Sequence, residues 1–337
     1  ENPRAFLGIQ VIDESKSSAR WSWMRIGAGI GMFVAFFIGW FILMRVLFPV
    51  PFHNKYANTS KHLSMPLLLI SIDGFRHDYL FRKVSADSHP LLSTNFSIGS
   101  HLAPTLIRLR NGGVSADSMK PVFPSSTFPN HWSIITGLYT ENHGIIANEM
   151  FDSSTNEWFR YGESKDPGRW WRGEPFWETL RRDSHGLKKS AVFFWPGSEI
   201  HTKQFSPPDK IQKPYDNSVP YETRVDTVIE WMQTVKNVSF AALYLNGVDH
   251  AGHSFGPNSV EVDVEIAKVD AAIDRLVKRL KTLEMDVNLV IVSDHGMTER
   301  SDDRSVALNE LMHNVKLETE TQIVTVSPIA GISHSKP

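Results

Sequence analysis

Two kinds of apolar segment alternate along most of this 337-residue chain. The first is a short continuous run, which is typical of a strand that is buried on both faces of a parallel sheet. Such runs occupy residues 66–72, 190–195, 240–245 and 287–292, with a weaker run at 322–326. In the second kind, apolar residues recur every three or four positions, as on one face of a helix; it occupies 221–235 and, more extensively, Val262 to Leu283. This alternation predicts an α/β sandwich with a mostly parallel central sheet.

One further apolar run has a different character, because residues 26–44 are nineteen residues without a charge. Arginines bracket the run, and residues 46–48 can extend it. About 20 apolar residues span a bilayer, whereas a buried core helix would show a polar face. The long polar stretch before the run argues against a cleaved signal peptide. We therefore predict a cytoplasmic tail at 1–25, a transmembrane signal-anchor at 26–48, a stalk at 49–64 and a globular domain at 65–337.

The orientation of this anchor is indicated by the segments on either side of it. Basic residues slightly favour the N-terminal side, and three glycosylation sequons, at Asn58, Asn95 and Asn237, all follow the run. Cytoplasmic flanks carry the basic excess, and sequons are acceptors only outside the cytosol. The pattern predicts a single-pass type II membrane protein whose globular domain is extracellular or lies in the lumen of a secretory or vacuolar compartment.

Composition limits the available chemistry. The chain has no cysteine and 14 histidines, so disulfides, thiolate metal sites and a cysteine nucleophile are excluded, and histidine is the available soft ligand. The formal net charge is only -2, which gives no sign of a nucleic-acid-binding surface. We expect no stable nucleic-acid partner. Hydrophobic residues make up 41% of the chain, enough for a sizeable core.

Acidic residues and histidines follow three of the predicted strands. Asp73 follows the first run, Asp249 and His253 follow the run at 240–245, and Asp294 and His295 follow the run at 287–292. A single Asp in such a place is commonly a turn or capping residue, and a lone His is commonly a core residue. In open α/β sheets, however, sites form beyond the carboxyl ends of the strands. Three occurrences therefore favour a site for Zn²⁺ or a similar divalent ion.

A hydroxyl cluster, Ser125, Ser126 and Thr127, lies where a loop enters the apolar run 132–138. A helix N-terminus there offers unpaired N–H groups to a phosphate, although a plain N-cap is the simpler interpretation. With the Thr127 hydroxyl the candidate ligands number six, one or two short of the roughly seven or eight that two ions need. Two nearby ions can stabilise both oxygens of a phosphoryl transfer and activate a hydroxyl, while the Asn148 amide could donate to a phosphoryl oxygen.

Six segments carry a family resemblance. They are Asp-Gly-Phe-Arg at 73–76, Thr-Phe-Pro-Asn-His at 127–131, His-Gly-Ile-Ile-Ala-Asn at 143–148, Phe-Trp-Pro-Gly-Ser at 194–198, Asp-His-Ala-Gly-His-Ser-Phe-Gly-Pro at 249–257 and Ser-Asp-His-Gly-Met at 293–297. In this order they resemble the nucleotide pyrophosphatase/phosphodiesterase family of the alkaline phosphatase superfamily. The resemblance implies an alkaline-phosphatase-like three-layer sandwich, here preceded by one transmembrane helix like the type II anchor of several family members.

The resemblance also implies residue roles. Thr127 would be the nucleophile, through a phosphothreonine intermediate, and Asn148 would contact a non-bridging oxygen. One zinc ion would be held by Asp73, Thr127, Asp294 and His295, and a second by Asp249 and His253. Phe128 and Tyr215 match positions that sandwich a nucleobase, with core packing as the alternative. The family's second zinc has a further His in a later His-Gly motif, which His334 does not match. We therefore expect a C-terminally truncated catalytic domain at 65–337.

The resemblance implies a hydrolase that uses two divalent ions, expected to be zinc ions as in the family. It would cleave nucleotide pyrophosphate or phosphodiester bonds and release nucleoside 5′-monophosphates. Its partners would be nucleotide or dinucleotide substrates and the membrane. A lipid phosphodiesterase acting on choline-phosphate head groups is an alternative on the same scaffold, and an ethanolamine-phosphate transferase of GPI synthesis is a more distant one. A catalytically inactive binding ectodomain is a third, although the presence of all six ligands argues against it.

Overall fold

The computed structural model describes residues 65–85, 87–160, 164, 166–306, 321–325 and 331–334. The predicted tail at 1–25, anchor at 26–48 and stalk at 49–64 lie outside these residues. Within the described ranges, no helix combines the length and the apolar character needed to cross a bilayer.

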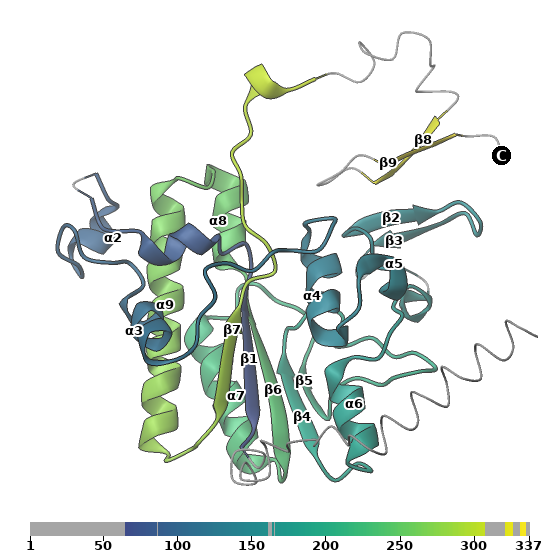
Figure 1. Cartoon of the computed structure of the whole chain (residues 1–337), viewed down its shortest axis with the longest axis horizontal. Coiled ribbons are helices and arrows are strands. Elements are labelled where there is room, and N and C mark those ends of the chain that lie inside the picture. The colour runs from purple at the N-terminus through teal and green to yellow at the C-terminus, as the bar shows by residue number, and fades with distance from the viewer. Residues whose placement is uncertain are drawn as a thin grey trace, which may run out of the picture. The chain divides into compact units, whose positions relative to one another are not determined.

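A five-stranded sheet forms the centre of the fold, in the order β5-β4-β6-β1-β7 (Figure 1). Its strands are β1 (Leu67–Ile72), β4 (Lys189–Phe193), β5 (Lys210–Gln212), β6 (Val238–Leu245) and β7 (Asn288–Val292). Every neighbouring pair is parallel, which confirms the predicted parallel sheet. Four of the strands, β1, β4, β6 and β7, coincide with the continuous apolar runs. For β1, β4 and β6 the cause is that a strand covered on both faces has no polar side to show, whereas the edge strand β7 is only partly buried.

Side-chain alternation divides the core into two clusters, one on each face of the sheet. Leu68, Ile70 and Ile72 of β1 belong to the first cluster, whereas Leu69 belongs to the second. The first cluster includes residues of α3 (Pro104–Gly112), α7 (Tyr221–Thr234) and α9 (Val260–Thr282). The second includes residues of α4 (Thr127–Thr136) and α6 (Phe176–Asp183). Figure 1 shows these helices on the two sides of the sheet, which is the expected three-layer arrangement.

The long amphipathic pattern after Val262 forms α9, as predicted. Ser259 caps the helix by accepting a hydrogen bond from the Val262 backbone N–H at 3.3 Å. Acidic residues occupy its first turn and basic residues its last, which suits the helix dipole. Its apolar stripe is fully or almost fully buried, at Val262, Ile266, Val269, Ile273, Leu276 and Leu280. The helix therefore derives most of its stability from packing in the first core cluster.

The remaining elements are short. They are α2 (Pro90–Ser93), α5 (Thr140–His143), α8 (Gly247–Phe255), 3₁₀ helices at His77–Phe81, Pro167–Arg169 and Asp302–Arg304, an antiparallel hairpin of β2 (Glu149–Asp152) and β3 (Glu157–Arg160), and a second hairpin of β8 (Thr321–Thr325) and β9 (Gly331–His334). One prediction was wrong here. The weak run at 322–326 forms β8, which pairs antiparallel with β9 and does not join the parallel sheet.

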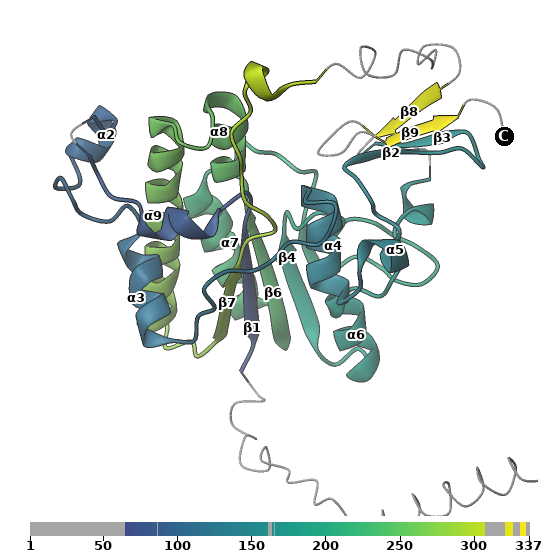
Figure 2. The same ribbon diagram turned by 45° about the horizontal axis from the view of Figure 1, so that its top comes forward.

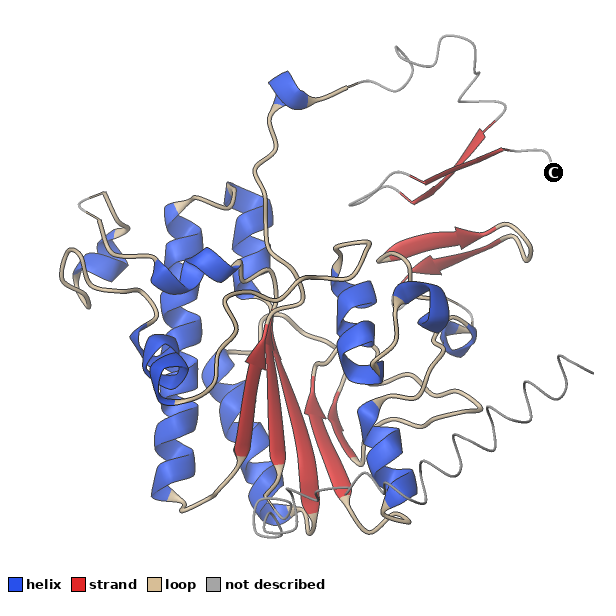
Figure 3. Cartoon of the chain, viewed as in Figure 1, coloured by secondary structure: helices blue, strands red, loops and turns tan. Residues whose placement is uncertain are grey.

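The carboxyl ends of β1, β6 and β7 meet at one edge of the sheet because the three strands are adjacent and parallel (Figure 3). Helix α8 starts two residues after β6, and both α8 and α4 lie near this edge in a second view (Figure 2). The segments that carry the predicted ligands are therefore gathered at one end of the fold.

Candidate active site

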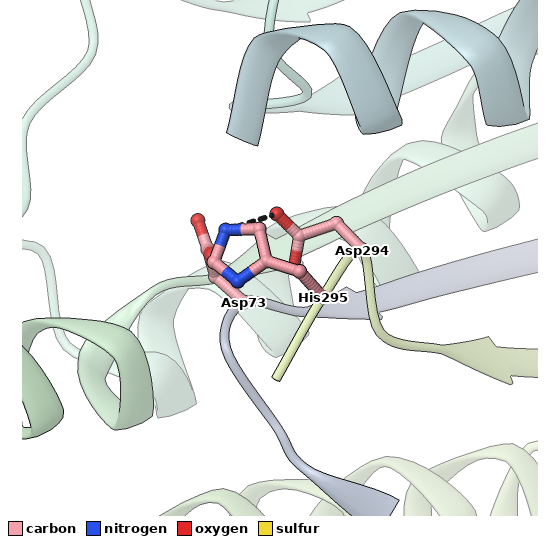
Figure 4. Close-up of side chains that lie close together, drawn as sticks. All are labelled: Asp73, Asp294 and His295. Atoms are coloured by element: carbon pink, nitrogen blue, oxygen red, sulfur yellow. Dashed lines mark ion pairs between the residues drawn. The ribbon is translucent and has the colours of Figure 1, made fainter. Parts of the chain in front are cut away.

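Three predicted metal ligands converge at this edge (Figure 4). One ligand atom each from Asp73, Asp294 and His295 can be chosen so that all three lie within 4.8 Å of one another. His295 Nε2 is 3.1 Å from Asp294 Oδ2 and 3.5 Å from Asp73 Oδ1. Both aspartates are almost inaccessible, each with 1% of its surface exposed. Residues more than two hundred positions apart thus form one compact group of two carboxylates and an imidazole. We call Asp73, Asp294 and His295 the Asp73 group.

Backbone and side-chain hydrogen bonds fix these ligands. The Asp73 backbone N–H donates to the Leu245 carbonyl at 2.9 Å, which joins the ends of β1 and β6. The Tyr244 hydroxyl donates to Asp73 Oδ2, and the Gly74 N–H donates to Asp294 Oδ1 at 3.1 Å. His295 Nδ1 lies 2.8 Å from the Gly296 carbonyl. If Nδ1 donates there, Nε2 presents a lone pair to the carboxylates, as a metal-binding imidazole does.

Asp249 and His253, the second predicted ligand pair, lie one turn apart on α8. Asp249 Oδ1 is 3.4 Å from His253 Nε2. The helix approaches the first group closely, because a Cβ built on Gly74 would lie 2.8 Å from Asp249 Cβ. His253 is largely exposed, and its interaction with the neighbouring Asp249 carboxylate raises the pKa of its imidazole. The pair therefore stands next to the Asp73 group, on its more open side.

The electrostatics of the edge favour a bound cation. Burial, together with Asp294 and Asp249, raises the pKa of Asp73 well above its ordinary value, and burial raises the pKa of Asp294 to about 7. Asp73 Oδ1, Asp249 Oδ1 and Asp294 Oδ2 are buried and accept no hydrogen bond from the described residues. Buried carboxylate oxygens that accept no hydrogen bond are costly, and a divalent ion would compensate them. Carboxylate and imidazole donors without sulfur fit Zn²⁺.

Thr127 is the first residue of α4, and its hydroxyl faces the Asp73 group. Thr127 Oγ1 lies 3.5 Å from His295 Nε2. Ser126 is the N-cap residue, yet its side chain makes no capping hydrogen bond. The hydroxyl cluster therefore marks a helix N-terminus, as predicted, and α4 begins at Thr127, the last residue of the cluster. Proline at the third helical position is tolerated because first-turn N–H groups have no helical partner.

Asn148 is brought to the same helix end. Its Oδ1 accepts the Phe128 backbone N–H at 2.9 Å, so its NH₂ group is the part that remains for a ligand. Buried Asn130 holds the preceding loop, because its Oδ1 accepts the Val122 N–H at 2.7 Å and its Nδ2 donates to the Ser126 carbonyl at 2.8 Å. The start of α4 is thus a rigid frame around the Thr127 hydroxyl.

The two predicted base-binding aromatics differ in environment. The Phe128 ring is half-buried and packs against the second core cluster, with its centroid 6.2 Å from that of Phe159 and 6.0 Å from that of Trp171. Tyr215 is 41% exposed, and its ring lies 5.1 Å from Phe194 and 6.1 Å from Tyr244, between ring centroids. Burial raises the pKa of Tyr215 to about 12, so its hydroxyl is neutral. Tyr215 thus flanks the Asp73 group, whereas Phe128 contributes to core packing.

Two residues of the site escaped the sequence analysis. Tyr244 orients Asp73, as described above. His131 is fully buried, with Nε2 2.8 Å from Ser71 Oγ and Nδ1 2.8 Å from the Thr127 carbonyl. Burial lowers the pKa of His131 to about 3, so the ring is neutral and links the start of α4 to β1. The available signals were weak: His131 lies four residues after Thr127, and Ser71 interrupts an otherwise apolar strand.

Comparisons with known proteins agree on one family. Residues 67–336 match the family described as type I phosphodiesterase/nucleotide pyrophosphatase. The chain is 39% identical over 256 residues to human ectonucleotide pyrophosphatase/phosphodiesterase family member 1, covering 74% of this chain and 25% of that protein. It is 35% identical over 283 residues to human bis(5′-adenosyl)-triphosphatase, covering 82% of this chain and 56% of that one. The chain thus spans only a quarter to about half of these curated relatives.

Solved structures give the same result. Murine ectonucleotide pyrophosphatase/phosphodiesterase 5 superposes with a TM-score of 0.69 at 32% identity, covering 81% of this chain and 67% of that one. An inactive threonine-to-alanine variant of the murine protein, solved in complex with AMP, also matches with a TM-score of 0.69, at 31% identity. At these identities the likeness extends to the family as well as the fold.

Proposed function

Because the chain belongs to the type I phosphodiesterase/nucleotide pyrophosphatase family, we propose that it is a metal-dependent hydrolase that cleaves pyrophosphate or phosphodiester bonds of nucleotides and releases nucleoside 5′-monophosphates. The observation that carries the proposal is the Thr127 hydroxyl, which lies at the N-terminus of α4 and 3.5 Å from His295 Nε2 in the Asp73 group. The AMP complex of a structural neighbour supports a nucleotide as the substrate.

Asp73, Thr127, Asp294 and His295 would hold one zinc ion, and Asp249 and His253 would contribute to a second. The buried carboxylate oxygens that accept no hydrogen bond from the described residues, and the sulfur-free donor set, support this assignment. Ions at these positions would favour the deprotonated Thr127 hydroxyl and neutralise charge on the phosphoryl oxygens.

The chain's own residues perform the remaining steps. Thr127 Oγ1 attacks phosphorus as the bond from phosphorus to the leaving oxygen breaks, and the Thr127 proton leaves with the departing group, which gives a phosphothreonine. The positive end of α4 and the Asn148 NH₂ group stabilise the non-bridging oxygens. Water then attacks phosphorus and the bond from phosphorus to Thr127 Oγ1 breaks. The oxygen of the water is retained in the 5′-monophosphate, and the Thr127 hydroxyl is restored. His131 holds the Thr127 backbone in place throughout.

Tyr215 and Phe128 are proposed to bind the nucleobase. Stacking on exposed aromatic rings contributes roughly 1–3 kcal/mol per base in other proteins. The partial exposure of Tyr215 beside the Asp73 group supports its part in this assignment.

We also propose that the catalytic domain, residues 65–337, is carried outside the cytosol by the anchor at 26–48, with a tail at 1–25 and a stalk at 49–64. The family match over residues 67–336 fits this domain boundary. The protein would then be a type II membrane glycoprotein, extracellular or in the lumen of a secretory or vacuolar compartment.

Substrate choice tests the proposal. The full-length protein, loaded with zinc, should release nitrophenol from p-nitrophenyl-TMP much faster than from p-nitrophenyl-phosphorylcholine. Chelation should abolish the activity, and added zinc should restore it. A preference for the phosphorylcholine ester would favour a lipid phosphodiesterase, and inactivity of the zinc-loaded protein toward both esters would favour a binding ectodomain.

A further inference from the structure

Arg224, in the first turn of α7, is a buried cation outside the proposed catalytic group. Its exposed fraction is 0%, and burial lowers the pKa of its guanidinium. An arginine nevertheless stays charged in proteins, and a buried charge is costly unless its donors are satisfied. No ion pair with a described carboxylate compensates Arg224. Its hydrogen bonds go instead to neutral acceptors, so its position has a structural cost that calls for an explanation.

These acceptors belong to three different segments. In the loop before α7, Arg224 Nε donates to the Val219 carbonyl at 2.9 Å, and Nη2 donates to the Asn217 carbonyl at 3.2 Å. At the end of β6, Nη1 donates to the Tyr244 carbonyl at 3.1 Å. At the start of α8, Nη1 also donates to Asn246 Oδ1 at 2.9 Å. One planar group therefore ties a loop to a strand end and to a helix.

Each of the three segments carries part of the candidate site. The loop follows Tyr215 directly, and its own turn is closed by Asp216 Oδ1, which accepts the Ser218 N–H at 2.9 Å. The Tyr244 hydroxyl binds Asp73, and α8 carries Asp249. Arg224 also lies 5.3 Å from the centre of the Phe194 ring, against which Tyr215 packs. The guanidinium thus lies between the proposed base-binding side and the proposed metal-binding side.

We propose that Arg224 is a positioning residue that fixes the Tyr215 loop against the ends of β6 and α8, and so sets the spacing between the nucleobase and the phosphoryl group of a bound nucleotide. The inference rests on the proposed function. It predicts that removing hydrogen bonds of the Arg224 guanidinium weakens the binding of substrates that carry a base. The phosphoryl step on base-free substrates should be little changed. Lysine cannot replace the planar fork, because it offers a single ammonium group.

Arg224→Lys in the zinc-loaded, full-length protein tests this. For p-nitrophenyl-TMP we expect KM to rise about tenfold, the size of one lost stacking contact, with kcat within about threefold. For bis-p-nitrophenyl phosphate, which has no base, kcat/KM should stay within about threefold. In a double-mutant cycle, Tyr215→Ala should add little in the Arg224→Lys background, because the base contact is already lost.

Arg275→Lys is the matched control. Arg275 also presents its fork to α7, donating to Asp226 at 2.8 and 2.6 Å, but this pair is partly exposed to solvent and joins α7 to α9 instead of to the loop. Its KM values should match those of the wild type within about twofold. If Arg224→Lys does not fold, Asn246→Ala replaces it. The only side-chain hydrogen bond of Asn246 within the described residues is with Arg224, and it does not cap α8, so a smaller rise in the same KM is expected.

Two results would overturn the inference: an unchanged KM for p-nitrophenyl-TMP in a folded variant, or an equal loss on both substrates, which indicates general core damage. Calorimetric titration with AMP separates this inference from the proposed function. A wild type that binds AMP but hydrolyses neither ester contradicts the hydrolase proposal alone, and a tenfold rise in Kd for AMP in Arg224→Lys would still support the role of Arg224. A wild type that neither binds AMP nor hydrolyses either ester contradicts both.

Discussion

The Thr127 hydroxyl approaches His295 across 168 positions of sequence, and this contact makes Thr127 the residue most exposed to test. Thr127→Ala should remove the proposed nucleophile and one proposed metal ligand, so we expect the rate to fall by a factor of about 10³ or more. Thr127→Ser should keep partial activity because its hydroxyl can occupy the same place. Rapid quenching in acid, followed by mass spectrometry, should locate the phosphoryl group on Thr127.

Ser125→Ala serves as the control for this experiment. Ser125 is exposed and lies outside α4, two residues before Thr127. Its replacement should have a mild effect. A phosphoryl label on Ser125 or Ser126, or full activity of Thr127→Ala, would rule out the proposed nucleophile and the mechanism built on it.

His143 allows a test of pH dependence away from the metal ligands. It is fully buried, its Nδ1 accepts the Ile145 N–H at 3.1 Å, and its Nε2 lies 2.9 Å from Ser133 Oγ. Burial lowers its pKa to about 4, from an ordinary value of 6.5. Between these pH values the unfolded chain binds more protons than the folded one, so the free energy of unfolding should decrease as pH falls from 6.5 to 4. The decrease should be up to about 1 kcal/mol per pH unit.

His143→Asn should flatten this part of the stability curve, because its amide cannot be protonated and its oxygen can still accept a hydrogen bond. Urea unfolding at pH 7 and pH 5, with a chelator present, measures the difference. His185→Asn, at an exposed turn position, is the control and should keep the wild-type difference. If His143→Asn and the wild type lose equal stability between pH 7 and pH 5, His143 is not the cause.

At the residue scale, the sequence was sufficient to find the side chains that follow strands. Asp73, Asp294 and His295 could be located because a polar residue that ends a buried strand stands out from the apolar run. Tyr244 could not, because it lies within such a run and its hydroxyl reaches Asp73 only through the pairing of Ser71 with Tyr244 between β1 and β6. That register is a property of the sheet, which no local pattern contains.

At the scale of elements, the approach of α8 to the end of β1 depends on one glycine. Gly74 has φ +65°, and a Cβ there would lie 2.8 Å from Asp249 Cβ and 2.9 Å from its Cα. Gly74→Ala should therefore displace α8 and separate Asp249 from Asp73. We expect less bound zinc per chain, or an apparent zinc affinity about tenfold weaker, because metal ligands tolerate small displacements poorly. Equilibrium dialysis with metal analysis measures this.

Gly137→Ala separates backbone strain from the steric effect. Gly137 follows α4 with φ +70°, and a Cβ on it would have open space around it, with no described residue beyond its chain neighbours within 4 Å. Alanine there should therefore cost only about 1 kcal/mol of stability. The zinc content of this variant should equal that of the wild type. Equal zinc binding by Gly74→Ala would contradict the close packing of α8 against this turn.

The elements were predictable where one physical cause dominated. Burial on both faces made β1, β4 and β6 readable as apolar runs, and a cap followed by a continuous apolar stripe did the same for α9. The run of β7 was equally readable, although this edge strand is only partly covered. The three residues of β5 are too few for a pattern. The start of α4 was predictable from the hydroxyl cluster at its N-terminus, although its first turn, with Pro129 and Asn130, lacks the apolar spacing of a helix. A weak apolar run indicates a strand but not the sheet that the strand joins, and β8 was assigned to the wrong sheet because it pairs with β9, the next strand along the chain.

At the scale of the whole molecule, the orientation across a membrane remains a prediction that the described residues can help to test. The sequon asparagines Asn95 and Asn237 are both exposed, while Asn58 lies outside the described residues. If the catalytic domain is outside the cytosol, the protein made in a eukaryotic host should carry glycans at these positions. Treatment with peptide N-glycosidase should then increase its electrophoretic mobility.

Single substitutions assign the effect to particular sites. Asn95→Gln and Asn237→Gln should each remove one step of the mobility shift if the domain is exposed to the glycosylation machinery. Asn156→Gln is matched to Asn237→Gln, because both residues are exposed and have positive φ, of 56° and 65°, but Asn156 is not in a sequon. It should leave the shift unchanged. Since a cytosolic domain meets no oligosaccharyltransferase, the absence of any shift with all three sequons intact would contradict the proposed orientation, whatever the catalytic activity of the domain.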